Sequence, residues 1–364
     1  MARKLSTLIL LAAALALSPA RAAAYLPPGF LGVSPQSAAT AKDMTLMRKA
    51  GIRSLRISLN WPAIEPDNPE YFLSDWSGFD REVGMAAEAG IEVLPTVWGS
   101  PDWVALERTA LPVRTAWQRR GWTRFLREAV RRYGPGGEFW DEHPELPYLP
   151  IRRWEIWNEE NIVSFAGSPE PAEYARLVRI SGRAVHAADG GAEVIVGGLF
   201  GRPLQVPPNV GLADFLNRLY RAGDVKPFFD AIGLHPYVAD ARAMRWQLQT
   251  MRRIMRRHGD GRTTIYVTEL GWGSRSGPTR WERGLYGQAR ELSRSLAILS
   301  ANRLRWRIGG AWWFSWRDAP PTGCLFCASS GLLTEDREAK PAWYRFNEWS
   351  GGNPDTVPRA KFGN

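Results

Sequence analysis

Short apolar runs alternate along the chain with longer amphipathic stretches. The short runs are rich in β-branched and aromatic residues, as buried strands are, and the longer stretches repeat apolar positions at helical spacing. We expect strands at 30–35, 52–60, 92–98, 153–157, 193–197, 231–235, 264–269 and 310–315. We expect helices at 38–50, 78–89, 115–133, 171–188, 213–222, 241–258 and 282–302, and a last one from Pro341.

Regular alternation of strands with helices predicts crossover connections and a parallel sheet. Eight such units favour a closed (β/α)8 TIM barrel, an α/β fold, as one domain over residues 25–350, followed by a polar C-terminal tail at 351–364. A doubly wound sheet has less support, because the stretch after the first strand, "FLGVSPQS", lacks a glycine-rich turn.

Signatures of cofactor and metal chemistry are missing from the sequence. It contains no Walker-type loop, no G-x-S-x-G and no H-E-x-x-H, and its four histidines are scattered. We therefore predict no cofactor and no metal site.

The first 24 residues resemble a secretion signal. Arg3 and Lys4 precede an apolar run at 5–17 that is too short to span a membrane, and small residues allow cleavage after Ala22 or Ala24. We expect a secreted protein, extracellular or periplasmic, with no integral membrane segment after cleavage.

The two cysteines stand close together, as Cys324 and Cys327. In an exported protein this spacing favours a small local disulfide. Zinc would require further ligands, and no second cysteine pair or histidine cluster is nearby.

The positive charge of the chain does not by itself identify a partner. The formal net charge of +10 falls to +7 when the signal, with three basic residues and no acids, is removed. Basic residues are spread over expected helices, as at 251–260, and are not interleaved with stacking aromatic residues, so we do not expect nucleic-acid binding. The sequence does not predict an oligomeric state.

Polar and aromatic residues gather where the expected strands end. In a barrel of this type the carboxyl ends of the strands form the active-site face. Two carboxylates facing each other there suit glycoside hydrolysis, and Trp rings suit the apolar faces of sugars. The strand-end residues are Asn60, Trp61, Trp98, Asn158, Glu159, His235, Tyr237, Glu269 and Trp316.

Two of these strand ends resemble a known group of enzymes. "IWNEEN" and "VTELGWGS" are similar to the signature strands of glycoside hydrolase clan A, the retaining (β/α)8 glycosidases, and most similar to families 5 and 39. "LRISLNWPAIEP", "GLHPY" and "GLLTEDREAKPAW" resemble the clan's strand two, strand six and the stretch after strand eight. The resemblance extends from Phe30 to Trp349, most of the chain after the signal.

The resemblance implies a carbohydrate substrate and a role for each matching residue. Glu159 would be the general acid/base and Glu269 the nucleophile. Asn158 would bond the sugar 2-hydroxyl. Tyr237 would bond the nucleophile and His235 would line the same wall.

Arg56 would support the nucleophile from below, and its alternative role is a buried structural ion pair. Among the 18 Trp residues, most are expected in the core. Trp316 would form the sugar floor by resemblance, whereas Trp98 and Trp61 suit packing as well as sugar contacts.

The alternation of faces along a strand makes further predictions about "WEIWNEE". If Glu159 points into the barrel mouth, Glu155 and Trp157 point inward too, and Glu155 is the expected partner of Arg56. Glu160 would point the other way, at a position where many clan members have Pro.

Three functions remain open from the sequence: a secreted retaining glycoside hydrolase, a transglycosylase that uses the same residues, and an inactive carbohydrate-binding barrel. The presence of both Glu159 and Glu269 favours an enzyme over a binding protein. The sugar, the linkage and the choice between endo and exo cleavage depend on loops that the sequence does not fold.

Overall fold

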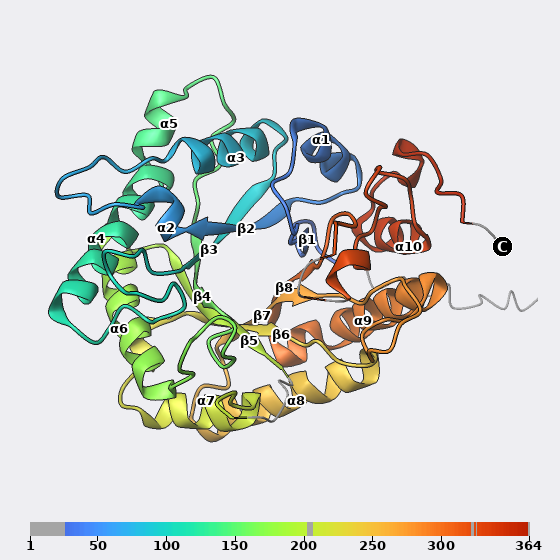
Figure 1. Cartoon of the computed structure of the whole chain (residues 1–364). Helices are drawn as coiled ribbons and strands as arrows, with labels where there is room; N and C mark the ends of the chain where they lie inside the picture. The colour runs from blue at the N-terminus through green and yellow to red at the C-terminus, as the bar shows by residue number, and fades with distance from the viewer. Residues whose placement is uncertain (1–25, 202–206, 322–323, 325, 363–364) are drawn as a thin grey trace, which may run out of the picture.

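The protein folds as a closed barrel of eight parallel strands with helices around it, as the alternation predicts (Figure 1). The computed structural model describes residues 26–201, 207–321, 324 and 326–362. Each strand pairs with its neighbours in sequence, and the last strand closes the barrel by pairing with the first. The strands are β1 (Leu31–Val33), β2 (Ser54–Asn60), β3 (Glu92–Trp98), β4 (Arg153–Asn158), β5 (Glu193–Phe200), β6 (Ala231–His235), β7 (Thr264–Leu270) and β8 (Ile308–Trp313).

Helices cover the outside of the barrel, and local sequence determines where several of them begin (Figure 1). Thr40 and Thr115 start their helices with capping boxes, in which side chains satisfy the free N–H groups of the first turn. The helices are α1 (Ala41–Lys49), α2 (Trp61–Ile64), α3 (Ser77–Glu88), α4 (Ala116–Tyr133), α5 (Glu138–Glu142), α6 (Pro171–Ala188), α7 (Leu212–Arg221), α8 (Ala241–Arg257), α9 (Leu285–Trp306) and α10 (Pro341–Ser350).

The short helices α2 and α5 were not predicted, because so few residues cannot show a helical repeat. Single 3-10 turns complete the secondary structure. They are η1 (Lys226–Phe228), η2 (Cys327–Ser329) and η3 (Pro354–Thr356).

Two separate apolar cores support the barrel mouth. The larger core lies between the strands and the surrounding helices. The smaller core consists of Leu94, Ile195, Ala231, Tyr266 and Trp312. These five residues lie on β3, β5, β6, β7 and β8, and they fill the interior as in a TIM barrel. Because this interior is filled, a ligand can enter only above it, at the carboxyl ends of the strands.

The ends of the chain differ in how far the structure describes them. The expected signal peptide, residues 1–24, lies outside the described residues. Part of the expected polar tail packs on the domain: Trp343 Nε1 donates to the Pro354 carbonyl oxygen at 2.8 Å, and Ala339 forms a β-bridge with Arg359. In the described part of the chain, no helix has both the length and the apolar character needed to cross a membrane.

Candidate active site

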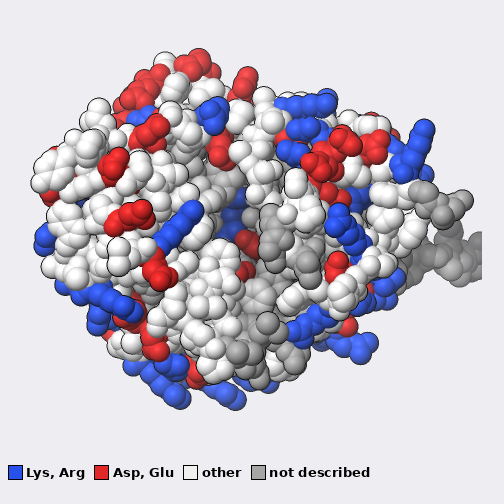
Figure 2. Space-filling view, in the orientation of Figure 1, with Lys and Arg blue, Asp and Glu red and all other residues white. Residues whose placement is uncertain are grey.

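A cavity of about 630 Å³ opens over the middle of the barrel. Figure 2 shows a hollow there, with acidic and basic side chains at its floor. Its lining combines four polar groups of the expected site with an apolar wall. The lining residues are Asn158, Glu159, Ile162, Ser164, Phe165, Phe200, Tyr237, Glu269, Thr279, Trp281, Phe314, Cys324, Phe326 and Cys327.

Arg56 connects the polar groups at the base of the cavity. Its Nε donates to Glu155 Oε2 at 2.6 Å, its Nη1 to Glu269 Oε1 at 2.5 Å, and its Nη2 to Asn158 Oδ1 at 2.8 Å. Thr96 Oγ1 also donates to Glu155 Oε2, at 2.6 Å. The expected pair of Arg56 and Glu155 is therefore present inside the barrel. Arg56 bonds the expected nucleophile as well.

The end of β4 does not keep the regular alternation of a strand. Trp157 has φ of 73° and Glu159 has φ of 43°, both in the left-handed region that side-chain-bearing residues rarely adopt. Trp157 is fully buried, and its ring contacts Trp122 of α4 at a centroid distance of 6.0 Å. The expectation that Trp157 points into the barrel is therefore wrong, because the left-handed turn rotates this part of the strand.

Glu159 lies in an environment that favours its protonated form. Its carboxyl group is almost completely buried, and its Oε1 lies 2.8 Å from His235 Nδ1. Burial raises the pKa of Glu159 well above its usual value, and the neighbouring Glu269 carboxylate raises it further. A carboxyl group of this kind can hold a proton near neutral pH, as a general acid must.

Glu269 lies in the same cavity but has more donors around its carboxylate. Tyr237 Oη donates to Glu269 Oε2 at 2.5 Å, and Arg56 bonds the other oxygen. Burial raises the pKa of Glu269, while Arg56 and Tyr237 oppose this rise. Glu269 therefore ionises at a lower pH than Glu159. Between their two pKa values Glu269 is ionised while Glu159 is protonated.

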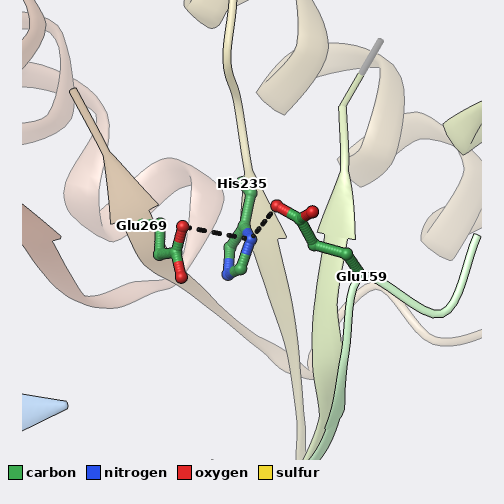
Figure 3. Close-up of side chains that lie close together, drawn as sticks. All are labelled: Glu159, His235 and Glu269. Atoms are coloured by element: carbon green, nitrogen blue, oxygen red, sulfur yellow. Dashed lines mark hydrogen bonds and ion pairs between the residues drawn. The ribbon is translucent and has the colours of Figure 1, made fainter. Parts of the chain in front are cut away.

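His235 lies between the two carboxyl groups (Figure 3). Its Nδ1 is 3.6 Å from Glu269 Oε2, and its Nε2 lies 3.1 Å from Thr268 Oγ1. Complete burial and the nearby Arg56 cation lower the pKa of His235 well below its usual value, so the ring is neutral. A neutral ring that donates from Nδ1 orients Glu159 without adding charge.

These three residues also need to be considered as metal ligands. Glu159, His235 and Glu269 each place one ligand atom within 4.8 Å of the others. Arg56 and Tyr237 already bond the Glu269 carboxylate, and the guanidinium group repels a metal ion at that position. We therefore assign the cluster to proton transfer.

Two of the expected sugar-binding Trp residues lie away from the cavity. Trp61 is fully buried, donates to Glu65 Oε2 at 2.7 Å and stacks on Phe125 in the outer core. Trp316 is buried and donates to Asp43 Oδ1 at 2.9 Å. Both assignments to substrate binding are therefore wrong. Trp61 begins α2, and Trp316 lies beyond the end of β8, so neither points as a barrel strand residue would.

Trp98 lies beside the cavity without lining it. Its Nε1 donates to Ser58 Oγ at 2.7 Å, and its ring meets the cavity residue Phe165 at 5.5 Å between centroids. Asn158 does line the cavity. Its amide nitrogen donates to no group among the described residues, so it is free to bond a ligand.

The apolar wall was not predicted from the sequence. Phe200, Phe314 and Phe326 surround the Tyr237 ring at centroid distances of 5.7, 6.1 and 5.2 Å. Phe314 directly follows β8, where its strand-end position was a usable signal. Phe200 ends β5, a strand that was predicted to end at residue 197. Phe326 and Trp281 lie in loops and carry no such signal.

The two cysteines form a disulfide at the edge of this wall. Cys324 and Cys327 are bonded, with Cα atoms 5.4 Å apart, and both line the cavity. The disulfide therefore ties the loop that carries Phe326 to the start of η2. The sequence predicted the bond but not its place in the cavity.

Comparison with known proteins supports the fold. No family model matches the sequence, and no curated protein matches it significantly. Among solved structures, a family 39 glycoside hydrolase from Bacteroides cellulosilyticus is similar, with a TM-score of 0.66, 20% identity, and coverage of 89% of this chain and 63% of that chain.

Two further structures have similar scores. A family 39 β-xylosidase from Caulobacter crescentus has a TM-score of 0.60 at 18% identity, covering 90% of this chain and 72% of that one. Xylanase 10B from Thermotoga maritima has a TM-score of 0.61 at 16% identity, covering 89% and 95%. This chain thus shares its TIM-barrel fold with glycoside hydrolases of several families, and it spans less than two thirds of the Bacteroides protein.

Proposed function

We propose that this protein is a secreted glycoside hydrolase that cleaves O-glycosidic bonds with retention of configuration. The observation that supports this most strongly is the pair Glu159 and Glu269, whose nearest carboxyl oxygens lie within 4.8 Å while their protonation environments differ. Retaining enzymes hold their two carboxyl groups about 5–5.5 Å apart, whereas inverting enzymes separate them by about 6.5–9.5 Å.

In the first step Glu269, as the carboxylate, attacks the anomeric carbon of the sugar. The bond between that carbon and the glycosidic oxygen breaks as a bond to Glu269 forms. Glu159 gives its proton to the departing oxygen, so the leaving group departs as a neutral alcohol. Arg56 and Tyr237 keep Glu269 ionised for this attack.

In the second step water releases the sugar. The bonded Glu269 no longer carries a negative charge, so one cause of the raised pKa of Glu159 is gone. Glu159, now a carboxylate, takes a proton from water, whose oxygen attacks the anomeric carbon and displaces Glu269. Both residues then regain their starting protonation states.

The neighbouring polar groups support these steps. Asn158 offers its free amide N–H group to the sugar hydroxyl next to the anomeric carbon, and Arg56 holds the amide oxygen. His235 holds Glu159 in place through Nδ1. The phenylalanine wall packs on apolar parts of the ligand and excludes water from the reacting atoms.

The cavity favours a small ligand. A volume of about 630 Å³ is within the usual range of small-molecule pockets, about 300–1,000 Å³. We propose exo cleavage, which releases a single terminal sugar. The similar structures include proteins named as xylosidase, mannosidase and xylanase, so xylosides and mannosides are the first substrates to test.

Secretion is part of the proposal. It is supported by the signal-like residues 1–24 and by the disulfide, which persists in oxidising compartments. Expression of the full chain in a bacterial host, with intact mass measurement of the exported product, tests it. A product that begins at Ala23 or Tyr25 is expected, and an unprocessed product retained in the cytoplasm would contradict secretion.

Covalent labelling tests the mechanism. A panel of aryl glycosides first identifies a sugar that is cleaved. The matching fluorinated glycoside, whose sugar stays attached to the nucleophile, is then incubated with the enzyme. Peptide mass spectrometry is expected to find the sugar on Glu269. Binding without a label for any sugar would favour a carbohydrate-binding barrel. A label followed by transfer to sugars instead of water would favour a transglycosylase.

Replacement of the nucleophile gives the matching genetic test. Glu269→Gln removes the attacking carboxylate while preserving its shape, so we expect turnover to fall by at least about 10⁴-fold. Glu88→Gln, which removes an exposed acid on α3, is the control and should keep wild-type rates. Normal turnover by Glu269→Gln would remove this residue from the proposed mechanism.

A further inference from the structure

Glu160 follows the proposed acid/base directly, and its side chain has no evident partner. The residue is completely buried, and neither carboxyl oxygen makes a hydrogen bond. An ionised carboxylate without a partner is far more costly to bury than a neutral carboxylic acid. Buried polar groups in native proteins are nearly always paired, so an unpaired acid at this place needs an explanation.

The surroundings of Glu160 consist mainly of oxygen atoms that accept hydrogen bonds. A side chain added at Gly197 would place its Cβ 2.6 Å from Glu160 Oε2 and 2.7 and 2.8 Å from the carbonyl oxygens of Ile156 and Trp157. These three oxygens therefore border the same small space between β4 and β5. Carbonyl oxygens repel a carboxylate but can accept a proton from a carboxylic acid.

Tyr174 of α6 does not supply the missing donor. Its hydroxyl faces Glu160, but it donates its single proton to the Ile156 carbonyl oxygen at 2.7 Å. The same hydroxyl accepts a bond from Gly197 N at 2.7 Å. Its remaining lone pair can accept a proton from Glu160. The Tyr174 hydroxyl only partly opposes the effect of burial on the Glu160 carboxyl group.

Other polar side chains at this strand end are satisfied. Asn161 Nδ2 donates to the carbonyl oxygens of Phe200 and Val210, and its Oδ1 accepts from Phe200 N. Trp157 Nε1 donates to the Phe165 carbonyl oxygen at 2.8 Å. Glu159 thus lies in a left-handed turn that is held firmly on both sides, with Glu160 packed behind it as the unpaired group.

The titratable groups around Glu160 agree with a neutral carboxyl group. Burial raises the pKa of Glu160 to about 8, although its own backbone N–H group and the Tyr174 hydroxyl oppose the rise, and the negative charge of Glu155 on β4 adds to it. Tyr174 is the titratable group that faces it from α6, and its own pKa is raised well above the usual value by burial. On β5 the contact is Gly197, which has no side chain to titrate.

We propose that Glu160 is a positioning residue, whose uncharged carboxyl group packs behind Glu159 and fixes the strand end that presents the acid/base to the substrate. Loss of the Glu160 proton places a charge among the oxygens of Ile156, Trp157 and Tyr174. The strand end then moves, and Glu159 leaves its productive position. The inference rests on the proposed function for the role of Glu159, but the neutral state of Glu160 does not depend on it.

Proton counting provides the first test. If Glu159 and Glu160 must both be protonated, log kcat/KM for an alkyl glycoside falls in alkaline solution with a slope that approaches −2. Glu160→Gln keeps a neutral group of similar shape, so its slope should be −1, set by Glu159 alone. Glu88→Gln should follow the wild type, because that exposed acid is far from the strand end.

A second substrate separates the acid role from general damage. A dinitrophenyl glycoside has a leaving group that departs without a proton, so its kcat/KM does not need a correctly placed Glu159. We expect this substrate to lose little activity at the pH where the alkyl glycoside loses most. Parallel losses with both substrates would indicate general unfolding and would overturn the positioning role.

Thermal stability provides a test that needs no activity. The pKa of Glu160 is about 8 when folded, against 4.5 as its ordinary value, so the folded state binds an extra proton between these values. The contribution of Glu160 to stability therefore falls as pH rises from about 4.5 to 8 and is constant above pH 8. The Tm of Glu160→Gln should fall less over this range than that of the wild type or of Glu88→Gln.

The outcomes are distinct. A wild-type slope of −1 overturns the positioning role, and this measurement does not require a folded variant. Equal pH dependence of Tm in the wild type and Glu160→Gln overturns the neutral buried carboxyl group. Glu160→Ala should have a lower kcat at neutral pH than Glu160→Gln. If no glycoside is cleaved at all, the proposed function fails while the Tm comparison still decides the state of Glu160.

Discussion

Arg56 determines the charge balance of the site at the scale of single residues. One guanidinium group contacts Glu155 and Asn158 of β4 and Glu269 of β7, and these strands meet Arg56 of β2 only in the folded barrel. Burial would otherwise favour protonation of every carboxyl group in the cavity. The cation and the Tyr237 hydroxyl act on Glu269, whereas His235 acts on Glu159, and this difference suits Glu269 to the proposed role of nucleophile and Glu159 to that of acid.

Removal of Arg56 should damage both stability and activity. Arg56→Met leaves Glu155 and Glu269 buried without their cation, so we expect a loss of about 3–5 kcal/mol in the free energy of unfolding. We also expect kcat/KM to fall by at least about 100-fold. Arg114→Met is the control, because its exposed ion pair with Glu173 should contribute less than about 1 kcal/mol. Denaturant unfolding measures the free energy of unfolding, and initial rates measure kcat/KM. Equal effects of the two variants would contradict the role of Arg56.

Removal of the Tyr237 hydroxyl should shift the acid limb of the pH profile. The hydroxyl donates to the ionised form of Glu269 and so lowers its pKa. Tyr237→Phe should therefore raise the pKa of Glu269, because a donor to its ionised form is lost. The acid limb of kcat/KM should move to higher pH with it. An unmoved acid limb would show that Tyr237 does not bond Glu269 during the reaction.

At the scale of elements, the ends of the strands decide which side chains reach the cavity. Regular alternation correctly places Arg56 and Glu155 inside the barrel. It fails at Trp157, where a left-handed residue rotates the chain. Trp316, which was placed in the site by resemblance, follows the end of β8. The last residues of a strand are no longer held by two paired neighbours, so loop packing decides their direction.

The end of β8 allows this distinction to be tested. Phe314 lines the cavity, so Phe314→Ala should weaken substrate binding by about 1–2 kcal/mol and raise KM about tenfold. Trp316→Phe removes a buried bond to Asp43 outside the cavity, so it should lower Tm and leave KM unchanged. Steady-state kinetics with thermal melts separates the two. A raised KM in Trp316→Phe alone would restore the original assignment of Trp316.

At the scale of the whole molecule, the first and last parts of the chain are joined around Asp43. This carboxylate of α1 is fully buried, accepts from Arg337 Nε at 2.8 Å and accepts from Trp316 Nε1 at 2.9 Å. Burial would raise the pKa of Asp43, but bonds from Arg337, Trp316 and Thr40 hold it well below its usual range. The contact supports closure of the barrel where β8 pairs with β1.

Stability in acid should depend on Asp43. Its folded pKa is depressed, so its contribution is present above the ordinary value of 3.8 and is lost as pH falls below that value. Asp43→Asn should be less stable than the wild type at pH 7 by about 2–3 kcal/mol, and the difference should shrink toward pH 2. The exposed acid Asp67 provides the control, Asp67→Asn. Thermal melts across pH measure both, and a pH-independent difference would contradict the argument.

Much of the architecture was predictable from the sequence. The eight strands appear in their expected order, and β3 and β6 have their expected bounds, because apolar periodicity reports burial directly. The strand-end residues Glu159, Glu269, Asn158, His235 and Tyr237 come together, since the carboxyl ends of all barrel strands share one face. The phenylalanine wall was not predictable to the same degree, because loop residues carry no periodic signal.

The sequence alone determined the barrel, the face that bears the site and the pair of glutamates, since these depend on alternation and on where strands end. Tertiary structure alone decided the protonation environment of each acid. Glu155, Glu159, Glu160 and Glu269 are the same residue type, and their differences arise from the donors, cations and oxygen atoms that distant segments bring to each one. Protonation depends on surroundings within a few ångströms, and only the folded chain assembles them.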